Sequence, residues 1–280
     1  MGIIDGKTVA SQIKENITTE VQSLKKKTGK TPGLAVVLVG DDPASAVYVR
    51  NKNKTCNNIG FQSFENILPA NTTESELLHL IHKLNIDEKV HGILVQLPLP
   101  NHISSNKILE AINPQKDVDG FHLENVGRLV TGNSLFKPCT PAGIIKLLDK
   151  YDVEIEGKNA VIIGRSNIVG KPVAFLLLQR NATVTICHSR TKNLSNLAAS
   201  ADILIAAIGK PNFVTADMVK DNSVVIDVGI NRLAGKLVGD VDFSSIVKKV
   251  SLITPVPGGV GPMTIAMLME NTFRAFKNSL

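Results

Sequence analysis

The sequence predicts an α/β fold of two domains, and three observations lead to this prediction. Short, nearly unbroken apolar runs recur between longer segments of helical periodicity, which is typical of a parallel sheet covered by helices on both faces. The chain has 280 residues, which is about two domains at ~150 residues each. A polar, turn-rich stretch at 113–141 separates two series of apolar runs, so we expect the domain boundary near its end.

The first half of the chain contains two clear strands and two helices. Residues 34–39 and 93–95 are apolar runs of strand length, as expected of buried strands. Residues 44–58 and 74–84 between them have the periodicity and length of helices. We therefore predict an N-terminal α/β domain over residues 1–142.

The second half is a denser series of the same kind. Four apolar runs are predicted as buried strands, at 160–163, 183–187, 203–207 and 224–228. Three segments are predicted as the crossovers between them, at 169–179, 194–200 and 216–219. This βαβ series predicts a Rossmann-like dinucleotide-binding domain over residues 143–261. A Pro/Gly-rich stretch at 254–264 then precedes a predicted helix at 265–277.

Composition excludes several classes of protein. Lys and Arg outnumber Asp and Glu by 31 to 25, which favours anionic partners. The chain has only two Tyr, nine Phe and no Trp, however, and in no segment do basic and aromatic residues interleave as they do on a base-stacking surface. A nucleic-acid module is therefore not expected. The longest apolar runs fall far short of the ~18 residues of a membrane span. The first residues lack the features of a secretory signal, so we expect a soluble, cytoplasmic protein without membrane partners.

The sequence offers no metal site. Cys56, Cys139 and Cys187 are far apart and odd in number, so neither a disulfide framework nor a zinc-binding pair can be drawn, and a reducing compartment fits best. His79 and His82 lie on a predicted helix without a third ligand nearby, and we expect both on the surface. We expect Cys56 to fill space in the core.

A glycine turn follows the predicted strand at 160–163. Strand, glycine turn and helix form the layout in which free backbone N–H groups face a bound phosphate. The turn is not a Walker A loop, because five residues separate its glycines and Pro172 follows the lysine. The nucleophile elbow G-x-S-x-G and the strict G-x-G-x-x-G fingerprint are also absent. The predicted cofactor-binding residues of this turn are Gly164, Arg165, Ser166, Ile168 and Gly170. The alternative is that the glycines serve only a tight turn and close helix packing.

The end of the next predicted strand favours NADP over NAD. In an NAD-binding unit, an acidic residue about 20 positions after the first glycine accepts a hydrogen bond from the ribose. Here the strand at 183–187 leads into His188, Ser189 and Arg190, with no acid. We therefore predict that Arg165, Ser189 and Arg190 contact a 2′-phosphate.

Several polar residues of the first half are candidates for chemistry. Tyr48 and Lys52 lie four residues apart on a predicted helix and can act on one ligand, although a solvated basic face is the alternative. Gln96 stands at the carboxyl end of a buried strand, where α/β proteins place their sites, or it is satisfied by backbone groups alone. Asp117 and Asp119 flank a turn, and turn formation is the alternative explanation for one of them.

Seven short motifs, in their order and spacing, resemble the bifunctional methylenetetrahydrofolate dehydrogenase/cyclohydrolase family. They are YVRNK, GILVQLPLP, KDVDGFH, KPCTP, VIIGRSNIVGKP, DVGINR and TPVPGGVGPMT. The resemblance implies that NADP oxidises 5,10-methylenetetrahydrofolate to the methenyl form, which water then opens to 10-formyltetrahydrofolate. It also implies a cleft between the domains, a homodimer formed through the second domain, and a C-terminal helix, 262–280, that returns to the first domain.

The same resemblance implies roles for four residues of the first domain. Lys52 handles the proton, Tyr48 lines or stacks on the folate, and Gln96 hydrogen-bonds near Lys52. Asp119 holds the amino-bearing edge of the pterin. A base works best with a pKa near neutrality, whereas a lysine titrates near ~10.4, so Lys52 has to be shifted by burial or by positive surroundings such as the bound cation.

In the second domain the resemblance implies contacts from two loops. Pro257, Gly258 and Gly259 bring backbone close to folate or nicotinamide, and Ile230 contacts the cofactor. Two other functions fit parts of the pattern: a different NADP-dependent dehydrogenase of the shikimate type, with Lys52 as its base, and a nucleotide-binding regulator without catalysis. Folate-dependent reduction of NADP distinguishes the first function from both.

Overall fold

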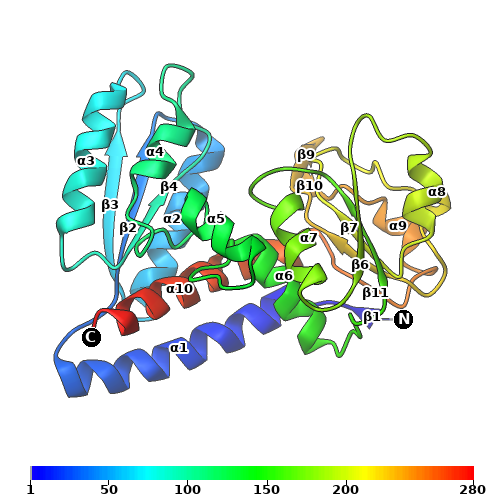
Figure 1. The fold of residues 1–280 in the computed structure, drawn as a ribbon, viewed down its shortest axis with the longest axis horizontal. Coiled ribbons are helices and arrows are strands. Elements are labelled where there is room, and N and C mark those ends of the chain that lie inside the picture. The colour runs from blue at the N-terminus through cyan, green and yellow to red at the C-terminus, as the bar shows by residue number, and fades with distance from the viewer. Residues whose placement is uncertain (1) are drawn as a thin grey trace. The chain divides into compact units, whose positions relative to one another are not determined.

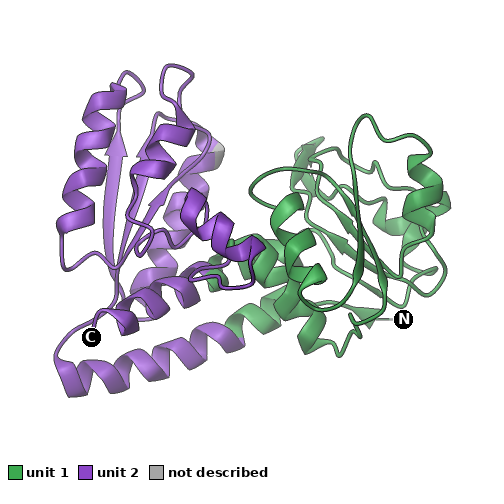
Figure 2. Ribbon diagram, in the orientation of Figure 1, with its two compact units in different colours: residues 1–11, 138–267 green, residues 12–137, 268–280 purple. Residues whose placement is uncertain are grey.

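The computed structural model describes residues 2–280, which form two compact units (Figure 2). The six-stranded unit, named after its sheet, consists of residues 138–267 and the N-terminal segment up to Ser11. The three-stranded unit consists of residues 12–137 and 268–280. Two long helices, α1 (Gly6–Thr28) and α10 (Val260–Asn278), contribute residues to both units.

The three-stranded unit is built on a parallel sheet in the order β3-β2-β4 (Figure 1). Its strands are β2 (Gly33–Val39), β3 (Gln62–Leu68) and β4 (Gly92–Val95). Its own helices are α2 (Pro43–Asn58), α3 (Glu74–Ile86), α4 (Ser105–Ala111) and α5 (Leu123–Val130). β2 and β4 are buried along their whole length, whereas β3, at the sheet edge, has no fully buried residue.

The six-stranded unit has a wholly parallel sheet in the order β1-β11-β8-β7-β5-β6. Its strands are β1 (Gly2–Ile3), β5 (Asn159–Ile163), β6 (Thr183–Cys187), β7 (Ile203–Ala206), β8 (Val224–Asp227) and β11 (Leu252–Ile253). β6 and β7 lie on opposite sides of β5. The order of the strands therefore reverses at β5, and in α/β sheets the carboxyl end of such a strand is where ligands bind.

Short elements complete the six-stranded unit. Its helices are α6 (Cys139–Lys150), α7 (Gly170–Leu178), α8 (Leu194–Ala199), the 3-10 helix η1 (Ala216–Met218) and α9 (Phe243–Ile246). β9 (Asn231–Leu233) and β10 (Lys236–Val238) form a separate antiparallel hairpin. One apolar cluster joins β5, β7 and β8 to α8 and α9.

The predicted fold class is confirmed. Each of the six predicted strands corresponds to an observed strand, and β6 has the predicted bounds. The prediction that β6 is a buried strand is wrong: it lies at the edge of the sheet, and only Cys187 in it is buried. α1 and β3 were not predicted, and α10 begins at Val260, inside the stretch predicted as a loop. None of the helices formed by residues 2–280 combines the length and the apolarity that a bilayer span requires.

The N-terminal segment differs from the predicted division of the chain, which assigns residues 1–142 to the first domain. β1 pairs in parallel with β11, and the Ile4 backbone N–H donates to the Ile253 carbonyl at 2.8 Å. The residues up to Ser11 therefore belong to the six-stranded unit. A two-residue strand has no periodicity of its own, so the sequence gives no sign of a partner at the other end of the chain.

The C-terminal helix returns to the first half of the chain, as predicted. Residues 268–280 belong to the three-stranded unit, whereas the start of α10, up to Met267, belongs to the six-stranded unit. The Asn271 amide donates to the carbonyls of Val118 (2.8 Å) and Lys137 (3.0 Å). The ring of Phe273 stacks on Phe61, with 6.4 Å between the ring centroids.

His91 joins the start of the three-stranded sheet to this helix. Its Nδ1 accepts the Gly33 backbone N–H at 2.9 Å, and its ring meets Phe276 edge to face, with centroids 4.9 Å apart. Burial, together with the charges of Lys116 and Lys30, lowers the pKa of His91 to about 4. The folded protein therefore requires a neutral imidazole at this position.

We expect stability to depend on pH through His91. The pKa of His91 is lower in the folded protein than its unfolded value of ~6.5. As the pH falls, the unfolded chain therefore binds this proton before the folded protein does. The free energy of unfolding that is present above pH ~6.5 is then lost progressively as the pH falls towards 4. Urea midpoints measured at pH 7.5 and pH 5 should show a smaller loss for His91→Gln than for the unmodified protein. His79→Gln, an exposed histidine on α3, serves as the control and should leave the loss unchanged. An equal loss in His91→Gln and the unmodified protein would contradict this assignment.

Candidate active site

Helix α2 carries Tyr48 and Lys52 one turn apart. Pro43 begins the helix, and Asp42 caps it by accepting the Ser45 backbone N–H at 2.7 Å. Val49 on this helix is buried, whereas Tyr48 is 39% exposed and Lys52 is half-buried. Helix α2 therefore packs on the core through Val49, while the Tyr48 side chain is accessible to solvent and that of Lys52 is partly accessible.

The same helix contains the predicted core cysteine. Cys56 is fully buried, and its Sγ lies 3.6 Å from Met269 Sδ. Burial raises the pKa of Cys56 to about 12, so the thiol stays protonated. The prediction that Cys56 fills core space is confirmed.

Gln96 lies beside Lys52, directly after β4. Its backbone N–H donates to the Val37 carbonyl at 2.8 Å, which continues the pairing of the strands. Its side-chain Nε2 donates to the Leu97 carbonyl at 2.7 Å, and its Oε1 accepts from Lys52 Nζ at 2.9 Å. The backbone contact fixes which end of the amide faces Lys52, so the acceptor is held towards the ammonium or amine group.

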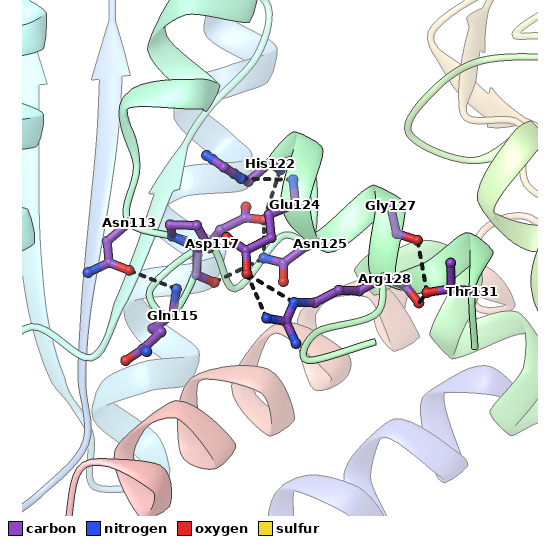
Figure 3. A network of polar contacts seen from close by, with 10 residues as sticks. Asn113, Gln115, Asp117, His122, Glu124, Asn125, Gly127, Arg128 and Thr131 are labelled. Atoms are coloured by element: carbon purple, nitrogen blue, oxygen red, sulfur yellow. Dashed lines mark hydrogen bonds and ion pairs between the residues drawn. The ribbon is translucent and has the colours of Figure 1, made fainter. Parts of the chain in front are cut away.

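Of the two predicted aspartates, Asp117 forms the turn (Figure 3). It is 1% exposed and accepts three hydrogen bonds, from the backbone N–H groups of Phe121 (3.1 Å) and His122 (2.9 Å) and from the Asn125 amide (2.7 Å). Burial raises the pKa of Asp117, because it outweighs these donors. Asp119 lies inside the turn, half-buried. The hydrogen bonds therefore identify Asp117 as the aspartate that forms the turn.

Two asparagines that the sequence analysis missed also hold this turn. Asn125, on α5, donates to the Pro114 carbonyl at 3.0 Å as well as to Asp117 (Figure 3). Asn271, on α10, donates to the Val118 carbonyl at 2.8 Å. The only sequence signal for either residue is a buried position on an amphipathic helix occupied by an amide.

In the six-stranded unit, the glycine turn connects β5 to α7 at the point where the strand order reverses. Gly164 has φ +132°, and a Cβ there would collide with the Ala207 carbonyl. A Cβ at Gly170 would collide with the Gly164 carbonyl. Ser166 Oγ accepts from the backbone N–H groups of Val169 (3.1 Å) and Gly170 (3.2 Å). The turn is therefore tight, and it brings the start of α7 against the end of β5.

The predicted phosphate contacts follow neighbouring strands. Ile163 and Cys187 are partners in the register of β5 and β6, so Arg165 and Ser189 both leave the sheet at its carboxyl edge. Arg165, Ile168, Ser189 and Arg190 are all exposed. An exposed arginine after each strand, with no carboxylate beside Ser189, fits the 2′-phosphate of NADP better than the ribose hydroxyl of NAD.

The predicted loop at Pro257, Gly258 and Gly259 packs on the start of α1. A Cβ at Gly6 would collide with the Gly259 carbonyl, and the Lys7 backbone N–H donates to the Gly258 carbonyl at 3.1 Å. Gly258 has φ +112°, which disfavours a side chain. The start of α1 therefore fixes the backbone of this loop.

Ile230 lies next to Gly261, just after the loop at 257–259. It is 46% exposed, and its Cδ1 lies 3.5 Å from the position of a Cβ at Gly261. The six-stranded unit thus groups Ile230 with the loop at 257–259 and, on neighbouring strands, the glycine turn with Ser189 and Arg190. Across residues 2–280, no group of three or more His, Cys, Asp or Glu side chains is placed to hold a metal ion.

Comparison with known families identifies both parts of the chain. The catalytic-domain model of tetrahydrofolate dehydrogenase/cyclohydrolase matches residues 4–119, and the NAD(P)-binding-domain model of the same enzymes matches residues 138–280. The chain belongs to the tetrahydrofolate dehydrogenase/cyclohydrolase family. The resemblance predicted from the seven motifs is thereby confirmed.

Members of the tetrahydrofolate dehydrogenase/cyclohydrolase family match the chain over its full length. The bifunctional protein FolD of Campylobacter hominis is 60% identical, over 100% of this chain and 99% of its own. The crystal structure of the FolD methylenetetrahydrofolate dehydrogenase/cyclohydrolase from Campylobacter jejuni is 55% identical, with a TM-score of 0.98 and 100% coverage of both chains. The Trypanosoma brucei enzyme, complexed with NADP and an inhibitor, is 41% identical, with a TM-score of 0.95 and coverage of 99% and 97%.

The shikimate-type alternative shares only the fold. A shikimate dehydrogenase from Aquifex aeolicus is 15% identical, with a TM-score of 0.55 over 88% of this chain and 92% of its own. This similarity explains why the two-domain pattern alone left that function open.

The buried turn predicts a defect in folate binding. Asp117→Asn loses part of its capacity to accept three hydrogen bonds, so the turn that carries Asp119 should loosen. We expect the KM for both methylene- and methenyltetrahydrofolate to rise about tenfold, equivalent to ~1.4 kcal/mol, within the range for an unsatisfied buried group. Steady-state kinetics of both activities measure this change.

The matched control is Asp221→Asn. Asp221 is an exposed aspartate that pairs with Lys249 at 3.5 Å, and it precedes β8, at the amino edge of the six-stranded sheet. Its KM values should stay unchanged. A lower urea midpoint for Asp117→Asn with unaltered KM values would show that Asp117 serves stability alone.

Proposed function

We propose that this chain oxidises 5,10-methylenetetrahydrofolate to 5,10-methenyltetrahydrofolate with NADP and hydrolyses the product to 10-formyltetrahydrofolate. Membership of the tetrahydrofolate dehydrogenase/cyclohydrolase family supports both reactions. The single observation of geometry that carries the proposal is the 2.9 Å contact between Lys52 Nζ and Gln96 Oε1. This contact places an amine and a fixed amide at the carboxyl end of β4.

In this proposal, four residues of the three-stranded unit bind and process the folate. Tyr48 offers an exposed ring on the same face of α2 as Lys52, and Asp119 offers a carboxylate to the amino-bearing edge of the pterin. Gln96 orients Lys52. An amide oxygen accepts a hydrogen bond from either an ammonium or an amine, so Gln96 keeps its contact when Lys52 changes its protonation state.

The dehydrogenase step needs alignment rather than a protein nucleophile. When bound, NADP supplies the acceptor for the hydride. The chain's own task is to hold two rings in register, which is a matter of positioning. We assign the cofactor contacts to the glycine turn, to Ser189 and Arg190 and to Ile230, and we assign backbone contacts with folate or nicotinamide to Pro257, Gly258 and Gly259.

The cyclohydrolase step needs a base. Water must lose a proton as it attacks the methenyl cation, and Lys52 is the residue to which we assign that proton. A bound cation near Lys52 favours the neutral amine, because like charges disfavour the charged form of a lysine. A carboxylate in place of Gln96 would favour the ammonium form, so the neutral amide suits this role.

The two domains divide these tasks in the proposal. The three-stranded unit, residues 12–137 and 268–280, binds folate, and the six-stranded unit, residues 138–267 with the N-terminal segment up to Ser11, binds NADP. We also propose a homodimer formed through the second domain, where Leu233 and Leu237 on the β9–β10 hairpin are 48% and 40% exposed.

A cytoplasmic location is supported by the three buried cysteines, which are thiols rather than disulfides.

Absorbance spectroscopy tests the proposed reactions directly. Methylenetetrahydrofolate and NADP should yield NADPH and the methenyl compound, whose absorbance should then decay faster than its spontaneous rate. A regulator without catalysis, or a dehydrogenase for another substrate, would form no NADPH from this folate.

Lys52→Met should separate the two activities. Dehydrogenase activity should remain measurable, because the rings can still be aligned, whereas cyclohydrolase activity should fall by ~100-fold to 10,000-fold, as is typical when a general acid or base is lost. The measured quantity is the ratio of the two losses. Lys54→Met, exposed two residues further along α2, is the control and should change neither rate. Equal losses in Lys52→Met would assign Lys52 to substrate binding.

Arg165→Ala should weaken the preference for NADP. A charge-assisted contact to the 2′-phosphate is worth about 1.5–3 kcal/mol, so we expect the unmodified protein to favour NADP over NAD by roughly 10-fold to 150-fold in kcat/KM. Arg165→Ala should narrow this gap. Arg180→Ala removes an exposed arginine that pairs with Asp149 at 2.8 Å and is the control. Equal efficiency with both dinucleotides in the unmodified protein would refute the assignment.

A further inference from the structure

Two buried aspartates lie behind the loops at the carboxyl edge of the six-stranded sheet. Asp227 is the last residue of β8, and Asp240 follows the β9–β10 hairpin. Their side chains are 3% and 0% exposed. Neither residue belongs to the candidate site derived above, and each carboxylate is fully enclosed by protein groups.

Asp240 holds the loop that follows β7. Its Oδ2 accepts from the backbone N–H groups of Ile208 at 2.7 Å and Gly209 at 3.0 Å. Its Oδ1 accepts from the Lys210 backbone N–H at 2.8 Å and from the Asn231 amide at 3.0 Å. Three consecutive backbone donors therefore converge on one carboxylate, so the conformation of this loop depends on Asp240.

Asp227 holds Asp240 in turn. Its Oδ1 accepts from the backbone N–H groups of Gly229 and Asp240, both at 2.9 Å, and its Oδ2 accepts from the Val241 N–H at 3.0 Å. A Cβ at Gly229 would collide with the Asp240 carboxylate, and a Cβ at Gly239 would collide with that of Asp227. The two aspartates, here called the aspartate clamp, thus occupy spaces that two glycines leave open.

The clamped loop borders the glycine turn. The Ala207 N–H donates to the Ile163 carbonyl at 2.8 Å, and the Ala207 carbonyl is the group that a Cβ at Gly164 would meet. The loop therefore begins beside the turn, at the edge where the strand order reverses and a dinucleotide is expected to bind. Asn231, the side-chain donor to Asp240, directly follows Ile230.

We propose that Asp240, supported by Asp227, is a positioning residue for NADP: it orders the loops at 207–210 and 229–231 before the cofactor binds. The inference rests on the proposed function, because it assumes that the glycine turn binds a dinucleotide. A loop that is already ordered does not have to lose conformational freedom when the ligand arrives, and this favours binding. Asp240 acts through the loops and does not itself touch the cofactor.

Asp240→Asn tests this role. The substitution keeps the shape of the side chain, but it places an NH2 group against backbone donors and removes the charge. We expect the Kd for NADP, measured by calorimetry without folate, to rise by ~10-fold to 100-fold, as for misplaced binding groups. Cyclohydrolase activity, which uses no dinucleotide, should remain close to that of the unmodified enzyme.

The matched control is Asp242→Asn, two residues along the chain. Asp242 caps α9 by accepting from the Ser245 N–H at 3.4 Å, and asparagine caps helices equally well. Its Kd for NADP should not change. An unchanged Kd for NADP in a folded Asp240→Asn protein would overturn the proposal, whether or not the two activities fall.

Amide exchange provides a second test that does not depend on a variant. In the unmodified, cofactor-free protein, the amides of residues 208, 209 and 210 should exchange more slowly than those of exposed loops, because the clamp already holds them. Exchange as fast as in an open loop would overturn the proposal even if Asp240→Asn failed to fold. Failure of the proposed function is distinguishable, since it would appear as absent folate-dependent NADPH formation while calorimetry still measured NADP binding.

Discussion

A carboxylate taken out of water has to be hydrogen-bonded, and this requirement fixes the turn that carries Asp119 and the loops at 207–210 and 229–231. Asp117 in the three-stranded unit and Asp227 and Asp240 in the six-stranded unit meet it mainly with backbone N–H groups. Burial raises the pKa of Asp117 and is the main cause that raises the pKa of Asp227 to about 6. At Asp117 and Asp227 the donors therefore only partly offset the cost of burying charge, and any loop movement that removed one of them would increase that cost.

This arrangement suits an enzyme whose chemistry depends on alignment. Transfer of a hydride between two bound rings asks little of the protein except that both are held at the right distance and angle. Loops with high conformational freedom would supply such geometry poorly, whereas loops tied to a buried group can supply it reliably. The hydrolytic step adds one demand, a base. We assign that role to Lys52, whose contact with Gln96 joins two rigid elements, a helix and the end of a buried strand.

The parts of the fold that could be predicted are those whose pattern is local. β2 and the strands from β5 to β8 are mostly short apolar runs, because helices cover both faces of a parallel sheet. β3 escaped prediction because its sequence, QSFENIL, is not an unbroken apolar run, and none of its residues is buried. α1 could have been found, since its large buried residues recur every four positions, at Val9, Ile13, Ile17 and Val21.

The site residues that the sequence did not reveal were missed for a different reason: their contacts are not local in the chain. Sequence reasoning found the residues that matched a motif or followed a strand. Spacing alone left Asp117 and Asp119 undecided, because both flank the same turn, and the family resemblance named Asp119. The structure adds the three hydrogen bonds by which Asp117 forms the turn. Asn271 lies 153 residues from the carbonyl of Val118 that it holds, so no local pattern announces it.

The glycine turn and the aspartate clamp are two uses of the same physics. A glycine-rich segment after a strand allows backbone N–H groups to crowd around one anion, because no Cβ obstructs the approach. At the glycine turn, where Ser189 and the two arginines are exposed, we assign that anion to a bound dinucleotide; at Gly229 and Gly239 it is the carboxylate of the protein's own aspartate. Glycine spacing alone does not tell these cases apart. What separates them is whether an acidic residue of the chain is buried against the glycines, as Asp227 and Asp240 are, or whether the positive groups beside the turn face solvent.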